Sequence, residues 1–290
     1  MKLGFIGAGK AGGSLSRYFA SKGLTISGFY SKTLEHARQA ADSIHSVAFL
    51  TLEEVVSESD MIFVTTPDGE IGPAWEKVKM LQKEDKVKLE GKVFCHCSGS
   101  LSSEVFGESR ELGVRACSAH PMWAIDSQAT ELENVFFTLE GSAGEIKGML
   151  ERCGNPVTVI DPALKARYHA AQAIVGNLTI GLVEIALKLL EDCGFGRKDA
   201  LQMLAPLMRG NLDNICARGP AAALTGAVER RDVGTVERHL ASLAGDQREI
   251  YRLLSCQLVP IAQQKNPKTD YTKMKDKLEE KSNEKYSSDF

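Results

Sequence analysis

The stretch Leu3-Gly4-Phe5-Ile6-Gly7-Ala8-Gly9-Lys10-Ala11-Gly12 joins a short apolar run to a glycine-rich turn, and a helical pattern follows it. In this context Gly7 permits a tight turn, Gly9 lets backbone N–H groups approach a pyrophosphate, and Gly12 allows close packing of helix on strand. The N-terminus of the helix also attracts an anion. The alternative is an ordinary tight turn between a strand and a helix. We expect a dinucleotide to contact Gly7, Ala8, Gly9, Lys10, Ala11 and Gly12.

Outward from this stretch, short apolar runs alternate with helical patterns. The runs are residues 3–6, 25–30, 61–65, 92–97, 114–118, 135–139 and 157–160. Such alternation is typical of βαβ units, in which helices cover both faces of a parallel sheet. The sequence therefore predicts an α/β fold for residues 1–161, a Rossmann-type doubly wound sheet that is mostly parallel.

From residue 162 the pattern becomes helical, which predicts an all-α domain over residues 162–264 for substrate binding and dimerisation. The expected helices are residues 163–190, 197–217 and 233–259. The first is apolar around most of its circumference, so it should be buried, and a second subunit would supply the burying surface. We therefore expect a homodimer formed through this domain. Residues 265–290 are rich in Lys, Glu, Asp and Ser, which predicts a charged, disordered tail.

Composition narrows the range of partners. The chain has 290 residues, of which 43% are hydrophobic, and a formal net charge of −3, so it lacks the basic surface that nucleic acid or an anionic membrane attracts. We find no apolar run of the ~18 residues needed to span a bilayer, and we expect a cytoplasmic protein. Seven scattered cysteines imply no disulfide framework. Cys95-His96-Cys97 lies in an expected buried strand without a second ligand pair, so we expect no metal.

The end of the second expected strand bears on the choice of cofactor. Residues 25–30 are followed by Ser31-Lys32-Thr33, without the Asp or Glu that usually accepts hydrogen bonds from the ribose of NAD. A hydroxyl and an ammonium suit a 2′-phosphate, so Ser31 and Lys32 predict NADP(H) rather than NAD(H). The alternative is that Lys32 is a solvated residue at a helix start.

Polar residues follow three further strands, at Thr65-Thr66-Pro67, Ser98-Gly99 and His120. Ligands of open α/β sheets bind outside the carboxyl ends of the strands, so we place the first two segments at the cofactor. Ser98 and His120 are also candidates for the substrate pocket. Each has a structural alternative: a turn at Thr66-Pro67, a helix cap at Ser98 and a packed structural side chain at His120.

The first long helix carries Lys165, His169 and Asn177, which with Ala173 lie four residues apart and drift slowly around the helix. Polar side chains on an apolar helix need a partner or a ligand, and a buried amide such as that of Asn177 needs hydrogen bonds. These three are our candidate catalytic residues. The alternative is that Lys165 and His169 lie exposed near the helix start.

Five motifs resemble those of one family: GFIGAGKAGGSL, CSGSLSSEVF, SAHPMWAI, KARYHAAQAIVGN and GPAAALTGAVERRDVGTVERHL. The sequence is similar, to about residue 262, to Rossmann-like proteins with a C-terminal domain of unknown function of the DUF2520 type, a family of NADP oxidoreductases. More distantly it resembles ketopantoate reductase, pyrroline-5-carboxylate reductase and the β-hydroxyacid dehydrogenases. The resemblance implies that the helical domain is like the C-terminal domain of 6-phosphogluconate dehydrogenase and that substrate binds between the two domains.

Residue by residue, the resemblance is incomplete. β-Hydroxyacid dehydrogenases pair a catalytic Lys with an Asn four residues later, whereas Lys165 is followed at that distance by His169. His120-Pro121-Met122 resembles the same tripeptide in prephenate and arogenate dehydrogenases. The segment around Thr225 resembles in position a loop that related reductases bring to the substrate, sometimes from the neighbouring chain; the alternative is a turn followed by a helix that Asp232 caps.

Together these features predict an NADPH-dependent oxidoreductase that reduces a small carbonyl or 2-oxo acid, ketopantoate-like in the leading interpretation. His169 or Lys165 would donate the proton, Asn177 and Ser98 would orient the substrate, and His120 and Thr225 would line its pocket. One alternative is an enzyme of the prephenate or arogenate dehydrogenase type or one that reduces imines. Another is a sensor or scaffold that binds NADP without catalysis.

Overall fold

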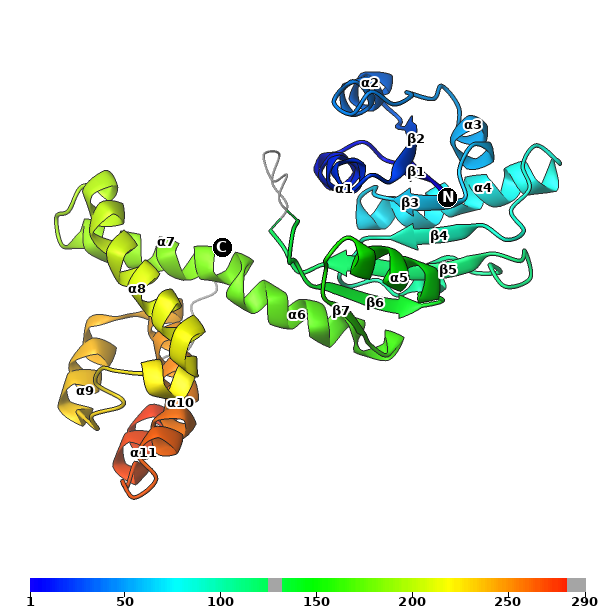
Figure 1. The fold of residues 1–290 in the computed structure, drawn as a ribbon. Helices are drawn as coiled ribbons and strands as arrows, with labels where there is room; N and C mark the ends of the chain where they lie inside the picture. Colours follow the sequence, from blue (N-terminus) through cyan, green and yellow to red (C-terminus); the bar gives the residue numbers. More distant parts are fainter. Residues whose placement is uncertain (125–131, 281–290) are drawn as a thin grey trace. The chain divides into compact units, whose positions relative to one another are not determined.

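The structure, a computed structural model, describes residues 1–124 and 132–280. The chain divides into two compact units, Met1–Thr179 and Ile180–Phe290, which are described separately below. The first contains the sheet and its covering helices, and the second is helical (Figure 1).

A seven-stranded sheet in the order β2-β1-β3-β4-β5-β6-β7 organises the first unit. All neighbouring strands are parallel except the antiparallel pair β5 and β6. The predicted doubly wound, mostly parallel sheet is therefore confirmed, with each strand close to its predicted place. The strands are β1 (Lys2–Ile6), β2 (Thr25–Tyr30), β3 (Met61–Val64), β4 (Val93–His96), β5 (Arg115–Pro121), β6 (Phe137–Gly141) and β7 (Val157–Val159).

Helices cover both faces of this sheet because the strands carry apolar side chains on both of their faces. On one face, α1 (Lys10–Ser21), α2 (Leu34–Asp42) and α5 (Gly144–Arg152) pack over a core that includes the stacked rings of Phe5 and Phe63. On the other, α3 (Leu52–Ser57) and α4 (Asp68–Lys83) pack over a core around Trp75 and Phe94 (Figure 1). Both cores hold the strand ends in fixed positions.

The first long helix differs from its prediction. Residues expected to form one helix over 163–190 form a short 3₁₀ turn, Pro162–Leu164, followed by α6 (Lys165–Val175) and α7 (Asn177–Asp192), with a break at Gly176, where ψ is −94°. In the single chain Ile174, Val175 and Ile180 are each at least 60% exposed, so the burial of this helix by a second subunit stays a prediction. The expectation that no apolar run reaches ~18 residues is also wrong, because within the described residues the stretch Pro162–Asp192 is long and apolar enough to cross a membrane, by length and composition alone.

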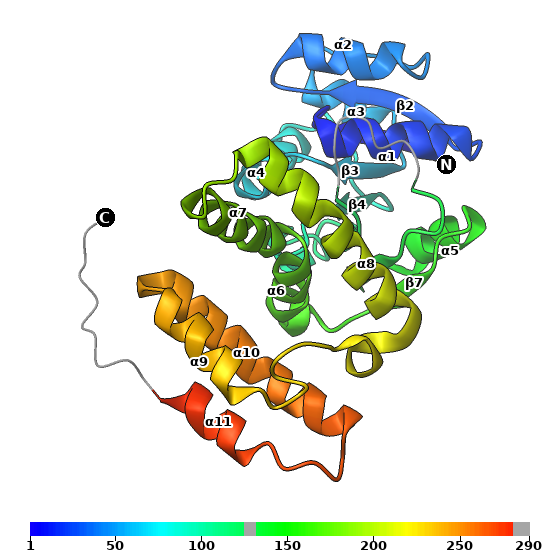
Figure 2. The same cartoon turned by 90° about the vertical axis from the view of Figure 1, so that its left-hand side faces the viewer.

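The second unit begins within α7 and contains α8 (Arg197–Ala223), α9 (Val233–Ser242), α10 (Gly245–Lys265) and α11 (Thr272–Glu279), of which the last three pack together (Figure 2). The helix predicted over 233–259 is two helices, because the chain is extended at Leu243 and Ala244. The expectation of a disordered tail from residue 265 is wrong for α11, whose Met274 and Leu278 are buried. Residues 281–290 of that expected tail lie outside the described residues.

The boundary between the units falls later than the predicted domain end at residue 161. The sheet does end at β7, but α6 and Asn177 to Thr179 belong to the first compact unit. The reason is that the first turns of α6 contact the ends of β4 and β5, through the side chains described next.

Candidate functional site

The glycine loop has the geometry that its sequence predicts. Gly7 has φ +106°, and a Cβ there would lie 2.9 Å from the backbone of Thr65 and Thr66. A Cβ at Gly12 would lie 2.4 Å from the carbonyl oxygen of Gly7, so α1 packs against the loop as closely as backbone allows. At Gly9, by contrast, a Cβ would meet nothing within 4 Å. The loop therefore leaves open space where a ligand would approach the backbone.

Helix α1 begins directly at this open space. Its N-cap residue, Gly9, has no side chain to accept hydrogen bonds from the first turn, and that turn contains no acidic residue. The first-turn N–H groups of Lys10, Ala11 and Gly12, at the positive end of the helix dipole, are therefore available to an anion.

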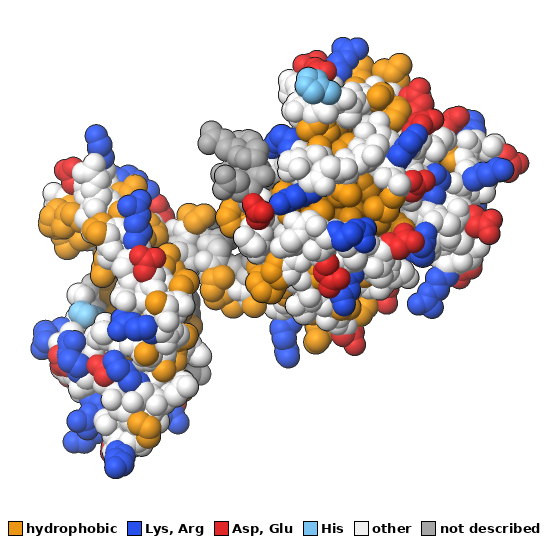
Figure 3. Space-filling model, viewed as in Figure 1, with side chains coloured by type: hydrophobic (Ala, Val, Ile, Leu, Met, Phe, Trp, Pro, Cys, Tyr) orange, Lys and Arg blue, Asp and Glu red, His pale blue; other side chains and the backbone are white. Residues whose placement is uncertain are grey.

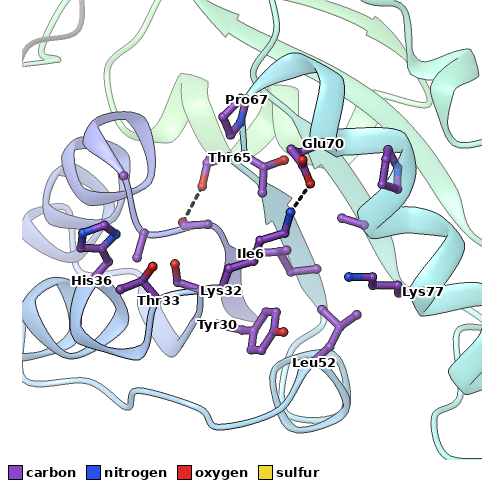
Figure 4. Close-up of a pocket in the computed structure, with 17 residues that line it drawn as sticks. Ile6, Tyr30, Lys32, Thr33, His36, Leu52, Thr65, Pro67, Glu70 and Lys77 are labelled. Carbon is purple, nitrogen blue, oxygen red and sulfur yellow. Dashed lines mark hydrogen bonds and ion pairs between the residues drawn. The ribbon is translucent and has the colours of Figure 1, made fainter.

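A cleft of about 280 Å³ lies beside the loop (Figure 4). Its lining includes eight of the predicted cofactor residues: Gly7, Ala8, Gly9, Ser31, Lys32, Thr65, Thr66 and Pro67. The Thr65 hydroxyl donates to the carbonyl oxygen of Gly7 over 2.7 Å. The Oγ1 atom of Thr66 is buried without a hydrogen-bond partner in the part of the chain that the structure describes. A bound ligand would supply that partner, so the lining fits a dinucleotide.

Four charged or titratable lining residues were not predicted: Tyr30, His36, Glu70 and Lys77. Glu70 lies in the first turn of α4 and accepts an ion-pair contact of 2.5 Å from Lys32. This hydrogen bond from Lys32 is the largest cause that lowers the pKa of the Glu70 carboxyl, and the charge of Lys77 contributes. The position of Glu70 three residues after Pro67, at a helix start, was the available signal.

A second cluster lies at the ends of β4 and β5. The Nζ atom of Lys165 donates to the carbonyl oxygen of Ser98 over 2.7 Å and to Oγ of Ser118 over 2.5 Å. Lys165 is only 1% exposed, and burial lowers the pKa of its ammonium. Lys165 therefore joins the start of α6 to two strands and is enclosed by protein.

Three ring side chains meet beside Lys165. The Tyr168 hydroxyl lies 2.9 Å from Nδ1 of His120, and the rings of His120 and His169 meet edge to face at 5.9 Å. A Cβ at Gly99 would lie 2.4 Å from the His169 ring and 2.9 Å from Nε2 of His120, so only glycine fits there. The structure thus brings together the predicted residues Ser98, Gly99, His120, Lys165 and His169, and it adds Tyr168.

Burial controls the protonation of this cluster. Burial, with a smaller contribution from the charge of Lys165, lowers the pKa of His120 to about 4. Burial likewise lowers the pKa of His96 to about 4. The pKa of the Tyr168 phenol is raised, because burial disfavours its ionised form. At neutral pH the His120 imidazole is therefore neutral and Tyr168 keeps its proton.

One carboxylate borders the cluster. Oδ2 of Asp68, the first residue of α4, accepts hydrogen bonds from Oγ of Ser98 over 2.7 Å and from Oγ of Ser100 over 3.1 Å. Asp68 itself is exposed, and it lies on the same helix turn as Glu70 in the cleft. The first turn of α4 therefore connects the cleft, through Glu70, with the cluster around Lys165, through Asp68.

Two further predicted site residues, Asn177 and Thr225, are exposed to solvent. Asn177 begins α7 and is exposed, so the expected buried amide is wrong for the single chain. Thr225 is exposed in the second unit, between α8 and α9. Asp232 caps α9 by accepting from the Thr235 N–H over 2.9 Å, as the structural alternative predicted. In residues 1–124 and 132–280 no three His, Cys, Asp or Glu side chains gather as a metal site.

Comparison with protein families gives one match in each half of the chain. Residues 2–88 match the family described as NADP oxidoreductase coenzyme F420-dependent, and residues 135–258 match the domain of unknown function DUF2520. The comparison with curated proteins found no match.

Solved structures of similar fold cover nearly the whole chain. Protein TM1727 from Thermotoga maritima is 27% identical, with a TM-score of 0.71 over 90% of this chain and 98% of that one. BF3122 from Bacteroides fragilis, named a "putative NADP oxidoreductase", is 23% identical, with a TM-score of 0.66 over 89% and 98%. An imine reductase from Myxococcus stipitatus in complex with NADP+ is 19% identical, with a TM-score of 0.57 over 91% and 93%.

The sheet, the glycine loop and its cleft define a dinucleotide-binding fold, and the family match of residues 2–88 specifies an oxidoreductase that uses NADP(H). The two matches confirm the predicted resemblance to Rossmann-like NADP oxidoreductases with a C-terminal DUF2520 domain.

Proposed function

We propose that this protein is an NADPH-dependent reductase of a small C=O or C=N substrate, with a 2-oxo acid such as ketopantoate as the leading candidate. The observation that carries the proposal is the position of α6, which sets His169 and Tyr168 at the ends of β4 and β5. Those ends neighbour, in strand order, the strands that border the cofactor cleft. In open α/β sheets such an edge is where cofactor and substrate meet.

The residues of the cleft suit each part of NADP(H). The backbone from Gly7 to Gly12 would bind the pyrophosphate, Ser31 and Lys32 would bind the 2′-phosphate, and the Thr66 hydroxyl would gain its missing hydrogen bond. When bound, NADPH supplies a hydride to the substrate carbon.

The proton that completes the alcohol or amine would come from α6. Lys165 does not suit this role, because its ammonium is enclosed and already donates to Ser98 and Ser118. We therefore assign Lys165 as a positioning residue and the N–H of His169 as the donor to the substrate oxygen or nitrogen. Tyr168, bonded to neutral His120, would hold that neighbouring ring in place.

Asp68 favours the imine interpretation as a second candidate. A 2-oxo acid needs a cation for its carboxylate, yet the ammonium of Lys165 is enclosed and Asp68 places a carboxylate at the border of the cluster. A carboxylate there suits a protonated imine better than an acid substrate. Similar folds occur in an imine reductase and in a reductive aminase from Aspergillus terreus in complex with NADPH.

The test is NADPH oxidation by purified protein against a panel of 2-oxo acids including ketopantoate, cyclic imines and prephenate-like dienes. We expect turnover on 2-oxo acids, or on imines if Asp68 sets the substrate charge. NADPH binding without turnover on every member would instead support a sensor or scaffold.

We also propose a cytoplasmic homodimer formed through the helical domain, residues 162–264. Large apolar side chains lie exposed over α7 and α8, among them Leu178, Ile180, Leu207 and Leu212 (Figure 3). Exposed apolar surface of this kind usually marks an interface. The partner would bury it and bring Asn177 or Thr225 to a substrate. Sedimentation at micromolar protein tests this: a mass near 31.5 kDa with full activity would exclude an obligate dimer.

A further inference from the structure

The ion pair between Lys32 and Glu70 lies across the cofactor cleft (Figure 4). Lys32 follows β2 and Glu70 lies in α4, so the 2.5 Å contact joins two elements on opposite sides of the opening. Both side chains line the cleft, and both are substantially exposed, at 67% and 43%. The contact can therefore open without disturbing the core.

Lys77 adds a second cation to the same wall. It lies two helical turns after Glu70 on α4, lines the cleft, and contributes with Lys32 to keeping the Glu70 carboxyl ionised. The Glu70 carboxylate thus occupies the place beside Lys32 and Lys77 that an anionic group of a ligand would need.

We propose that Glu70 competes with the 2′-phosphate of NADP(H) for Lys32 and thereby limits the preference of this protein for NADPH over NADH. The inference rests on the proposed binding of NADP(H) in this cleft. A 2′-phosphate can pair with Lys32 only after Glu70 has moved away, and the remaining like charges repel each other. The ribose of NADH carries no such charge, and its hydroxyls can donate to a carboxylate.

Glu70 also supplies an acid that the end of β2 lacks. Ser31-Lys32-Thr33 contains no Asp or Glu, but the fold brings the carboxylate of Glu70 from α4 to the ammonium of Lys32. Glu70 and Lys32 then favour opposite cofactors, and their balance sets the selectivity.

The experiment measures dissociation constants for NADPH, NADH and the fragments 2′,5′-ADP and 5′-ADP by calorimetry at low salt. In Glu70→Gln we expect NADPH and 2′,5′-ADP to bind about three- to tenfold more tightly, a range set by exposed ion pairs. NADH and 5′-ADP should bind equally or more weakly. In Lys32→Met, NADPH should bind more weakly. Adding Glu70→Gln to this variant should tighten NADPH binding less than Glu70→Gln alone does in the wild type, because only the repulsion between carboxylate and phosphate is then removed.

Glu76→Gln is the matched control, because Glu76 changes the net charge equally from the same helix but pairs with Lys79 outside the cleft. It should leave all four constants unchanged. Unchanged or weaker NADPH binding in Glu70→Gln, or an equal gain in Glu76→Gln, would overturn the inference. Failure of the wild-type protein to bind either dinucleotide would instead overturn the proposed function.

Discussion

The Nζ atom of Lys165 lies 2.7 Å from the carbonyl oxygen of Ser98, a residue 67 positions earlier in the chain. This contact fixes the first turn of α6 against the loop that follows β4. Because His169 is one helical turn further on, the same contact determines where the proposed proton donor lies. The buried ammonium of Lys165 therefore positions the side chain of His169.

Replacing Lys165 by Met tests this role. The change keeps the aliphatic stem but leaves the Ser98 carbonyl and the Ser118 hydroxyl without their donor, so the free energy of unfolding should fall by about 1–3 kcal/mol. Turnover should also fall, with NADPH affinity unchanged. Urea unfolding and calorimetry measure both. Wild-type stability together with wild-type turnover would contradict the assignment.

Two glycine substitutions separate folding from cofactor binding. Gly9→Ala meets no atom within 4 Å, so its melting temperature should match the wild type, whereas NADPH should bind at least about tenfold more weakly because the Cβ occupies the approach to the backbone. Gly12→Ala should destabilise the fold as well, since its Cβ would lie 2.4 Å from the Gly7 oxygen. Normal NADPH affinity in Gly9→Ala would place the pyrophosphate elsewhere.

Stability should depend on pH through His96 and His120. Burial lowers the pKa of each to about 4, below the ordinary value of 6.5, so between these values the unfolded chain takes up protons that the native chain does not. Above pH 6.5 neither state is protonated and stability is unaffected. The free energy of unfolding should therefore fall as pH drops from 6.5 to 4, by on the order of 3 kcal/mol per histidine.

His120→Gln should reduce the slope of this dependence by nearly one proton. Denaturant unfolding at several pH values measures it. An identical slope in wild type and variant would show that His120 takes up its proton equally in both states.

Tyr168→Phe removes the hydroxyl that bonds to Nδ1 of His120 without removing the ring. We expect turnover to fall about tenfold through loss of ring positioning, while the dissociation constant of NADPH stays the same. Steady-state kinetics with the best substrate of the panel provide the check. Equal turnover would leave Tyr168 outside the site.

The strands and the glycine loop were predictable because their signals are local: alternating apolar runs, and glycines at a spacing that a tight turn requires. Glu70 was not, because its contact with Lys32 arises only when α4 and the end of β2 meet in the fold. Likewise Lys165 could be read as an exposed lysine, since nothing local shows that two strand ends will enclose its ammonium. The break at Gly176 also depends on a single residue within an otherwise continuous helical pattern.

The most direct test of the account is the rate of NADPH oxidation by His169→Ala at saturating NADPH, with the best substrate of the panel. We predict a fall in turnover of about a hundredfold, with the NADPH dissociation constant unchanged, because the variant keeps the cleft and loses the proton donor. A turnover equal to that of the wild type would contradict the proposed mechanism.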